Sequence, residues 1–304
     1  MRVESIIEAV GKIVQPESML IKEPMSKHTS FQIGGPADVF VTPKNEHELN
    51  QVLQLCNEHD IPLLIMGKGS NMLIADDGIR GVVVQIGHYF SRVHVNHDYI
   101  TTQSGVTLSS LSRTLLQHSL SGFEFAAGIP GTIGGALAMN AGAYGGEMKD
   151  ILISCRVMDP KGQINELSCN EMELGYRTSR VQKTKEIVLS AKFRFNKGKY
   201  RQIKFLLDDY WQRRITKQPY YMPSGGSVFK RPEGYFAGKL IEDCHLKGVC
   251  VGGAMVSELH AGFIVNTGAA TADDVVRLMN LIQKRVKEKF DVDLEPELRV
   301  VGLS

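Results

Sequence analysis

The order of hydrophobic and polar positions follows two periods, one typical of strands and one typical of helices. Alternating or short continuous apolar runs at 37–43, 62–67 and 81–87 predict strands. Between the first two runs, residues 45–60 carry apolar side chains at helical spacing and predict a helix. A short amphipathic helix is expected at 3–14. The start of the chain therefore predicts a small α/β unit.

The rest of the chain continues this mixture. Further strand-like segments lie at 99–105, 151–168, 186–195 and 294–302. Further helix-like segments lie at 107–122, 201–218, 236–247 and 271–290. Thr107 is the expected N-cap of the first of these helices, and Gly122 is its expected stop. A turn signal at Pro160–Gly162 predicts a hairpin, and residues 220–236, rich in Gly and Pro, predict a loop.

The clearest helix is 271–290, because one apolar stripe runs along its whole length. Thr271 and Asp274 resemble a capping box at its start. Taken with the other elements, this helix indicates an α+β protein. The chain is expected to divide into three consecutive regions, at 1–88, 89–205 and 206–304.

Composition and charge narrow the class of protein. The chain of 304 residues is 43% hydrophobic and 22% charged, which is typical of globular proteins. A formal charge of +2 without any basic run argues against a nucleic-acid partner. Five scattered cysteines without a C-x-x-C pattern indicate reduced thiols in the cytoplasm. The N-terminus has no signal-peptide pattern, so a cytoplasmic protein is expected.

One uncharged, glycine-rich stretch, GIPGTIGGALAMNAGAYGG, runs from Gly128 to Gly146. A membrane span is excluded by Pro130, Asn140 and the excess of Gly over Leu and Ile. A second glycine-bearing loop, GKGSNM at 67–72, follows a predicted strand. Its spacing fits a plain turn and a phosphate-binding backbone nest about equally. The two histidines of HVNH (94–97) lack further ligands nearby, so no metal site is expected.

Other polar residues carry little information alone. Ser227 in SGGSVF and Arg177 in GYRTSR fit a turn serine and a surface arginine. Glu295, Glu297 and Arg299 share strand parity and therefore one predicted face. That face fits a solvated edge by default, or a carboxylate beside an arginine in a cleft.

Six segments, taken in their order along the chain, favour the functional interpretation of these loops and polar residues over the plain structural one. They are TSFQIGGPAD (29–38), GKGSNMLIADDGIRGVVV (67–84), FEFAAGIPGTIGGALAMNAGAYGGE (123–147), GYRTS (175–179), GGSVFKRP (225–232) and LEPELR (294–299). The set resembles the UDP-N-acetylenolpyruvoylglucosamine reductases, in their shorter, type II form. The resemblance implies a two-part FAD-binding module, with a small α/β subdomain (1–88) and a mixed α+β subdomain (89–205). An α+β substrate-binding domain (206–304) follows, and its last strand returns toward the flavin.

The resemblance also implies the residues that bind FAD. A diphosphate needs several backbone N–H donors at close range, which glycines allow. The implied FAD-binding residues are Ile33, Gly34, Gly35, Gly67, Lys68, Gly69, Ser70, Asn71, Gly128, Ile129, Pro130, Gly131, Thr132, Gly134, Gly135, Asn140, Ala141 and Gly142. For Asn140, anchoring of the segment is favoured over contact with the flavin. A Gly131→Val substitution is expected to impair FAD binding before it impairs folding.

The resemblance implies a reaction in two halves, in which NADPH reduces FAD and reduced FAD then passes a hydride to C3 of an enolpyruvyl group. Negative charge left at C2 has to be stabilised and then protonated. Arg177 and Glu297 match the stabilising pair, with Glu297 expected to be protonated or to share a proton, and Ser227 matches the proton donor. Tyr176, Arg214 and Lys217 are the implied substrate contacts.

The implied substrate is UDP-N-acetylglucosamine enolpyruvate, and the implied product is UDP-N-acetylmuramate for peptidoglycan. Arg231 stands where such enzymes often have Asn, and His260 fits a cleft residue and a packed residue equally. The alternatives are another oxidoreductase or oxidase with the same FAD module, a flavin-binding sensor without catalysis, and a colourless scaffold. The oligomeric state is left open, with a monomer favoured.

Overall fold

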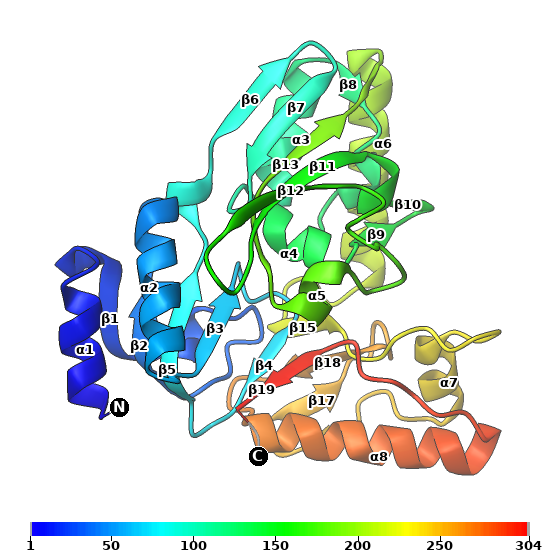
Figure 1. Ribbon diagram of the computed structural model, residues 1–304. Coiled ribbons are helices and arrows are strands. Elements are labelled where there is room, and N and C mark those ends of the chain that lie inside the picture. Colours follow the sequence, from blue (N-terminus) through cyan, green and yellow to red (C-terminus); the bar gives the residue numbers. More distant parts are fainter. Residues whose placement is uncertain (1, 303–304) are drawn as a thin grey trace. The chain divides into compact units, whose positions relative to one another are not determined.

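The computed structural model describes residues 2–302 and has an α+β fold (Figure 1). The α-helices are α1 (Val3–Gly11), α2 (Glu46–Glu58), α3 (Leu108–Gln117), α4 (Ile133–Ala138), α5 (Arg180–Thr184), α6 (Tyr200–Lys217), α7 (Ala237–Asp243) and α8 (Ala272–Phe290). The strands are β1 (Met19–Pro24), β2 (Pro36–Val41), β3 (Leu63–Met66), β4 (Met72–Ile74), β5 (Ile79–Gln85), β6 (Val93–Asn96), β7 (Tyr99–Gln103), β8 (Leu120–Ser121), β9 (Gly142–Ala143), β10 (Gly146–Glu147), β11 (Leu152–Met158), β12 (Ile164–Ser168), β13 (Ile187–Arg194), β14 (Asn196–Lys197), β15 (Ser224–Ser227), β16 (Cys250–Val251), β17 (Ala254–Val256), β18 (Phe263–Asn266) and β19 (Arg299–Val301).

The chain forms two compact units made of interleaved segments. Unit 1 consists of Met1–Ile21, Val39–Lys68 and Gly81–Arg213, and unit 2 consists of Lys22–Asp38, Gly69–Arg80 and Arg214–Ser304. The chain passes from one unit to the other within β1, β2, β5 and α6, and once more between Lys68 and Gly69. The division into three consecutive regions, at 1–88, 89–205 and 206–304, therefore stays a prediction.

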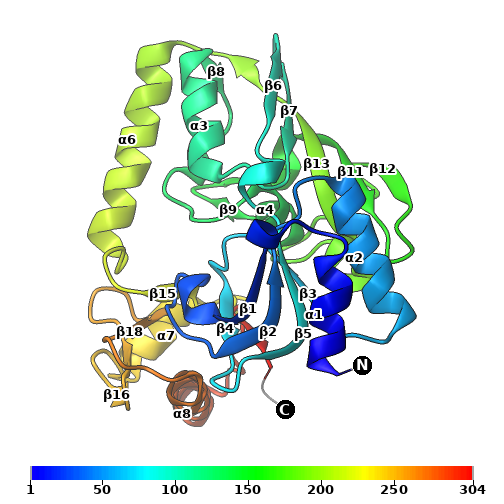
Figure 2. The same ribbon diagram turned by 90° about the vertical axis from the view of Figure 1, so that its left-hand side faces the viewer.

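Unit 1 holds an antiparallel sheet in the order β12-β11-β13-β7-β6. The predicted hairpin at Pro160–Gly162 joins β11 to β12 and is confirmed. Figures 1 and 2 show α3 and α4 beside this sheet. Leu111 and Leu137 of these helices are fully buried in one core with Phe193 of the sheet. Burial of an apolar side chain of this size contributes about 1.5–3 kcal/mol to folding.

The end of α3 corrects one prediction. The helix begins at its expected cap, because Thr107 Oγ1 accepts a hydrogen bond from Ser110 N at 3.1 Å. It ends at Gln117, and Ser119 adopts a positive φ of 53° soon after. Gly122 is therefore not the stop signal, since the short strand β8 lies between it and the helix.

A second sheet has the order β1-β2-β5-β3, in which β3 and β5 are parallel. The first two helices, α1 and α2, bury apolar side chains in the core of unit 1. Gly81 has a φ of 96°, and a Cβ there would lie 2.2 Å from Pro62 O. Glycine at this position therefore lets the loop before β3 approach β5.

Unit 2 holds an antiparallel sheet in the order β15-β18-β17-β16, and α8 lies along it (Figure 1). The capping box of α8 is confirmed, because Thr271 Oγ1 accepts from Asp274 N and Asp274 accepts from Thr271 N. Phe31, Ile33 and Leu73 share the core of this unit with residues of 228–298. Unit 2 therefore draws its core from three separate stretches of the chain.

Two predictions in this unit need correction. The expected loop at 220–236 contains β15, whose pairing with β18 is irregular between Ser224 and Ser227. The expected final strand shortens to β19, which pairs in parallel with β4. Glu295 and Glu297 precede β19, so they do not share a strand face with Arg299.

No helix among the described residues is long and apolar enough to cross a membrane.

Candidate active site

In unit 1, the glycine-rich stretch folds as a loop, the short helix α4 and the β9–β10 hairpin. The loop contains Gly128 with a φ of 72° and Gly131 with a φ of 139°, conformations that side-chain-bearing residues rarely adopt. Valine at 131 would therefore strain the backbone even without a ligand. The order in which Gly131→Val impairs FAD binding and folding stays a prediction, and the stability of the apoprotein has to be measured beside its FAD content.

The hydrogen bonds of α4 show which backbone donors a ligand could use. Ile133 N donates to Val106 O, Gly134 N to Ser104 O, and Gly135 N to Thr132 Oγ1. The first turn of α4 is thus satisfied within the chain. Within residues 2–302, the backbone N–H groups of Gly128 and Gly131 have no such partner. These two loop donors fit a diphosphate better than the helix N-terminus does.

The second predicted cofactor loop approaches the same place in unit 1. A Cβ on Gly67 would lie 2.4 Å from Thr132 Oγ1. Gln85 Nε2 donates to Gly67 O at 3.1 Å and holds the loop from the other side. The structure therefore brings Gly67 and Lys68 next to the glycine-rich stretch, as one candidate cradle.

The other predicted cofactor residues lie in unit 2. Ser30 N donates to Gly69 O, which places the TSFQIGG segment beside Gly69, Ser70 and Asn71. A Cβ on Gly35 would lie 1.9 Å from Asp76 O, so the packing of the chain already requires glycine there. Ile33, two residues earlier, is buried in the core of unit 2.

In unit 2, backbone hydrogen bonds bring Glu297 to Val228, the residue that follows Ser227. Val228 O accepts hydrogen bonds from Glu297 N at 2.8 Å and from Leu298 N at 3.3 Å. Gly226, with a φ of 82°, forms the irregularity of β15 directly before Ser227. The predicted sharp turn at Ser227 is thus a bulged strand. Within residues 2–302, the Ser227 hydroxyl has no hydrogen-bond partner.

Asn71 links the predicted cofactor loop to this pair. Its Nδ2 donates to Glu297 O at 3.0 Å, and its backbone O accepts from Arg299 N at 3.1 Å. The parallel pairing of β4 and β19 continues from these bonds. The loop that ends in Asn71 therefore sets the position of the backbone at Glu297.

Arg177 lies in unit 1 on a two-residue turn. Gly175 and Thr178 exchange backbone hydrogen bonds across Tyr176 and Arg177. Arg177 has a φ of 53°, its Nη2 donates to Gly142 O at 3.4 Å, and its guanidinium lies 5.2 Å from the Tyr176 ring centre. The turn thus holds the arginine beside the β9–β10 hairpin.

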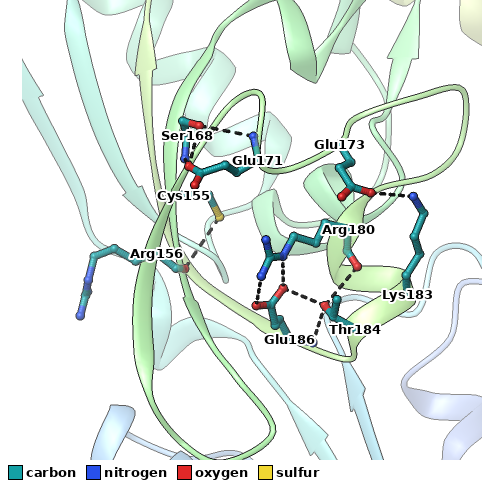
Figure 3. Close-up of polar contacts among 9 residues, drawn as sticks. All are labelled: Cys155, Arg156, Ser168, Glu171, Glu173, Arg180, Lys183, Thr184 and Glu186. Atoms are coloured by element: carbon teal, nitrogen blue, oxygen red, sulfur yellow. Dashed lines mark hydrogen bonds and ion pairs between the residues drawn. The ribbon is translucent and has the colours of Figure 1, made fainter.

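The helix α5 that follows the turn is tied down by an ion pair, shown in Figure 3. Arg180 donates to Glu186 through Nε at 2.9 Å and Nη2 at 3.1 Å. Thr184 Oγ1 donates to Glu186 as well, at 2.7 Å. The Glu186 side chain is only 5% exposed, so the pair is a fixed part of the fold and not a solvated contact.

Arg214 and Lys217 lie in the last turn of α6. Arg214 is buried, and its Nη1 donates to Gln218 Oε1 at 3.0 Å. His260 is packed: its Nδ1 accepts from Gly262 N at 3.0 Å and its ring meets Phe263 edge-on. Burial lowers the pKa of His260 below its ordinary 6.5. Burial therefore favours the neutral ring over the charged one.

The α+β fold, with its glycine-rich loop beside Gly67, fits the class of FAD-binding oxidoreductases. Residues 37–168 match the family model for an FAD binding domain. Residues 218–301 match the model for the C-terminal domain of UDP-N-acetylenolpyruvoylglucosamine reductase. Full-length relatives give the particular family: the chain belongs to the UDP-N-acetylenolpyruvoylglucosamine reductases.

Three relatives illustrate the match. The chain is 50% identical to the reductase of Alkaliphilus metalliredigens over 98% of both chains. It is 53% identical to the reductase of Clostridioides difficile over 95% of both. It also resembles the crystal structure of the reductase MurB from Thermus caldophilus, with a TM-score of 0.79, 31% identity, and coverage of 93% of this chain and 98% of that one.

Proposed function

We propose that the chain reduces the enolpyruvyl group of UDP-N-acetylglucosamine enolpyruvate, with NADPH as reductant, to the lactyl ether of UDP-N-acetylmuramate. Its full-length similarity to reductases named for this substrate supports the proposal. The product serves peptidoglycan synthesis. We place the enzyme in the cytoplasm. We also propose that it is a monomer, which light scattering of the purified protein tests.

FAD fits the residues present. The orphaned backbone donors of Gly128 and Gly131, close to Gly67, are of the kind that a diphosphate accepts. Both loop glycines are half-buried and Pro130 between them is exposed, so the loop lies at the surface of the protein. When bound, FAD supplies the chemistry by which a hydride from NADPH reaches the substrate carbon C3.

The observation that carries the proposed chemistry is the hydrogen bond from Glu297 N to Val228 O, which places Glu297 beside the residue that follows Ser227. Ser227 has an uncommitted hydroxyl, and it donates the proton to C2. Glu297 and Arg177 stabilise the charge that develops on the substrate carboxylate before that proton arrives. Glu297 does so as a hydrogen-bond donor and must hold a proton at that moment.

Tyr176, Arg214 and Lys217 are proposed to bind the substrate. A lysine ammonium is a point charge suited to a diphosphate. Lys217 stands at the C-terminal end of α6, where the last carbonyls of the helix also favour a cation. Arg214 donates to Gln218 and is therefore held in place before any ligand arrives.

The experiment compares the two half-reactions in wild type and Ser227→Ala. The variant is expected to be reduced by NADPH at the wild-type rate and to lose reoxidation by UDP-N-acetylglucosamine enolpyruvate by about 100-fold or more, the usual effect of general acid catalysis. Stopped-flow absorbance of the flavin gives both rates. Wild-type turnover in this variant would refute the role of Ser227.

The same experiment separates the alternatives. A flavin-binding sensor would show a flavin spectrum and no substrate-dependent consumption of NADPH. An oxidase with the same FAD module would consume O2 and ignore the enolpyruvyl substrate. A colourless protein after purification and incubation with FAD would refute the flavoenzyme itself.

A further inference from the structure

Asn140 is a buried polar residue whose side chain is engaged at both ends. It is 1% exposed. Its Oδ1 accepts a hydrogen bond from Lys149 N at 3.0 Å, and its Nδ2 donates to Gly175 O at 3.1 Å. Its backbone is left-handed, with a φ of 41°. A side chain held this way is committed to the protein and not to a ligand.

The acceptor of the Asn140 amide is one end of the turn that carries Arg177. Gly175 and Thr178 close this turn, and Arg177 sits between them with a positive φ. A left-handed conformation costs a residue with a side chain about 1–2 kcal/mol. Such a conformation persists only where surrounding contacts over-determine it. The hydrogen bond to Gly175 is one of these contacts.

A second set of contacts fastens the same turn to the end of α4. Ser179 is fully buried, and its Oγ donates to Ala138 O at 2.7 Å. Gln182 Nε2 donates to the same carbonyl and also to Arg177 O. The last carbonyl of α4 thus receives two side chains from the residues that follow the turn. Asn140 stands two residues beyond that carbonyl.

These contacts connect two regions of unit 1 that are far apart in sequence. The loop at Gly128 and Gly131 leads into the N-terminus of α4, and the turn of Arg177 is fastened at its C-terminal end. A helix of six residues is a short rigid connector between them.

We propose that Asn140 is a positioning residue for Arg177: its amide fixes Gly175 and thereby aims the guanidinium at the charge that develops on the substrate. Asn140 acts through the turn and does not touch the flavin. This inference rests on the proposed function, because it takes Arg177 as the group that stabilises the developing charge.

The test is Asn140→Asp, which keeps the shape of the side chain and removes the N–H that Gly175 O accepts. We expect FAD content and the rate of flavin reduction by NADPH within about twofold of wild type, because neither depends on Arg177. Flavin reoxidation by the enolpyruvyl substrate should fall about tenfold, which corresponds to the loss of one ordinary buried hydrogen bond.

A matched control is Glu173→Gln in the same segment. It breaks a surface ion pair between Glu173 and Lys183, both of which are more than half exposed. Both half-reactions should remain at wild-type rates. If Asn140→Asp does not fold, Ser179→Ala removes the second fastening of the turn and should slow reoxidation alone by at least about threefold. An unchanged reoxidation rate in this variant would overturn the inference.

The variant Arg177→Ala distinguishes a failure of the proposed function from a failure of the inference about Asn140. If it leaves reoxidation unchanged, the proposed role of Arg177 is wrong and the inference falls with it. If it slows reoxidation and Asn140→Asp does not, only the inference falls. Loss of FAD from Asn140→Asp would make Asn140 a cofactor ligand and also overturn the inference. In the Arg177→Ala background, Asn140→Asp should have no further effect, as expected for two residues in one pathway.

Discussion

At the scale of single residues, the glycines of the cofactor segments serve different purposes. Gly35 and Gly67 are required by the protein itself, because a Cβ would strike Asp76 O or Thr132 Oγ1. Gly135 is different: the nearest atom to its Cβ would be Thr132 Oγ1, at an ordinary 3.7 Å, and its φ is not left-handed. The packing of the chain therefore does not explain why position 135 lacks a side chain.

A Gly135→Ala substitution tests whether a ligand explains it. Alanine is more stable than glycine within a helix by about 0.5–1 kcal/mol, so the apoprotein should become slightly more stable to urea. FAD affinity should fall about tenfold or more if the cofactor lies against this position, as titration of flavin fluorescence would show. Gly134→Ala is the contrast, because its Cβ would lie 3.0 Å from Ser104 Cβ, and it should stabilise the apoprotein less than Gly135→Ala does. Undiminished FAD affinity in Gly135→Ala would place the cofactor elsewhere.

At the scale of elements, α8 shows how a local signal and a tertiary contact combine. Thr271 and Asp274 cap the helix reciprocally, and Asp274 also accepts from Gly253 N at 3.1 Å. Asp76 accepts from Ala272 N at 2.8 Å and Asp273 N at 3.2 Å. Four backbone donors at the start of α8 and one from the β16–β17 turn are thereby satisfied by side chains.

Thr271→Ala removes one of these caps. It should lower the free energy of unfolding by about 1 kcal/mol, as measured by urea denaturation. Asp273→Asn is the matched control, since Asp273 forms only an exposed pair with Arg277 at 3.5 Å and should change stability by less than about 0.5 kcal/mol. A loss in Asp273→Asn equal to that in Thr271→Ala would contradict the capping account.

The same cap should respond to acid. The backbone donors of Thr271 and Gly253 hold the pKa of Asp274 below its ordinary 3.8. A carboxyl whose pKa is lowered on folding stabilises the protein above its unfolded pKa, and this stabilisation is lost as the pH falls through the folded pKa. Wild type should therefore lose stability below about pH 3.8 more steeply than Asp274→Asn does, in thermal melts at a series of pH values.

At the scale of the whole molecule, the chain is not a string of independent regions. Unit 2 combines Lys22–Asp38 and Gly69–Arg80 with Arg214–Ser304. Phe31 and Leu73 are fully buried in its core, and β4 is the partner of β19. The last third of the sequence thus lacks part of its own core and the strand with which β19 pairs.

A fragment of residues 206–304 should therefore fail to fold by itself. Each buried apolar side chain that it lacks contributes about 1.5–3 kcal/mol, against a total domain stability of about 5–15 kcal/mol. Its circular dichroism should show no cooperative thermal transition and its amide NMR signals should be poorly dispersed. A well-dispersed spectrum would show that the region is an autonomous domain. Co-expression with residues 1–205 should restore a folded complex, and FAD binding by that complex would provide the control.

Features that depend on neighbouring residues and on periodicity could be predicted from the amino-acid sequence. The caps at Thr107 and Thr271, the hairpin at Pro160–Gly162 and the α+β class follow from local chemistry and the spacing of apolar positions. The ordered motifs also led to the family that the comparisons confirm. Local signals gave a wrong prediction at Gly122, because α3 already ends at Gln117. They also missed β15, because this strand forms only by pairing with β18.

Tertiary structure alone decided how the candidate site is held together. Asn71 reaches the Glu297 carbonyl across 226 positions, and Asn140 reaches Gly175 across 35. No periodicity or turn rule relates residues at such separations, because their contact depends on how sheets and helices pack. The residue types that a flavin and its substrate require can be read in the chain. Which asparagine fastens which segment, and which glycine has room for a side chain, is decided only when the fold brings them together.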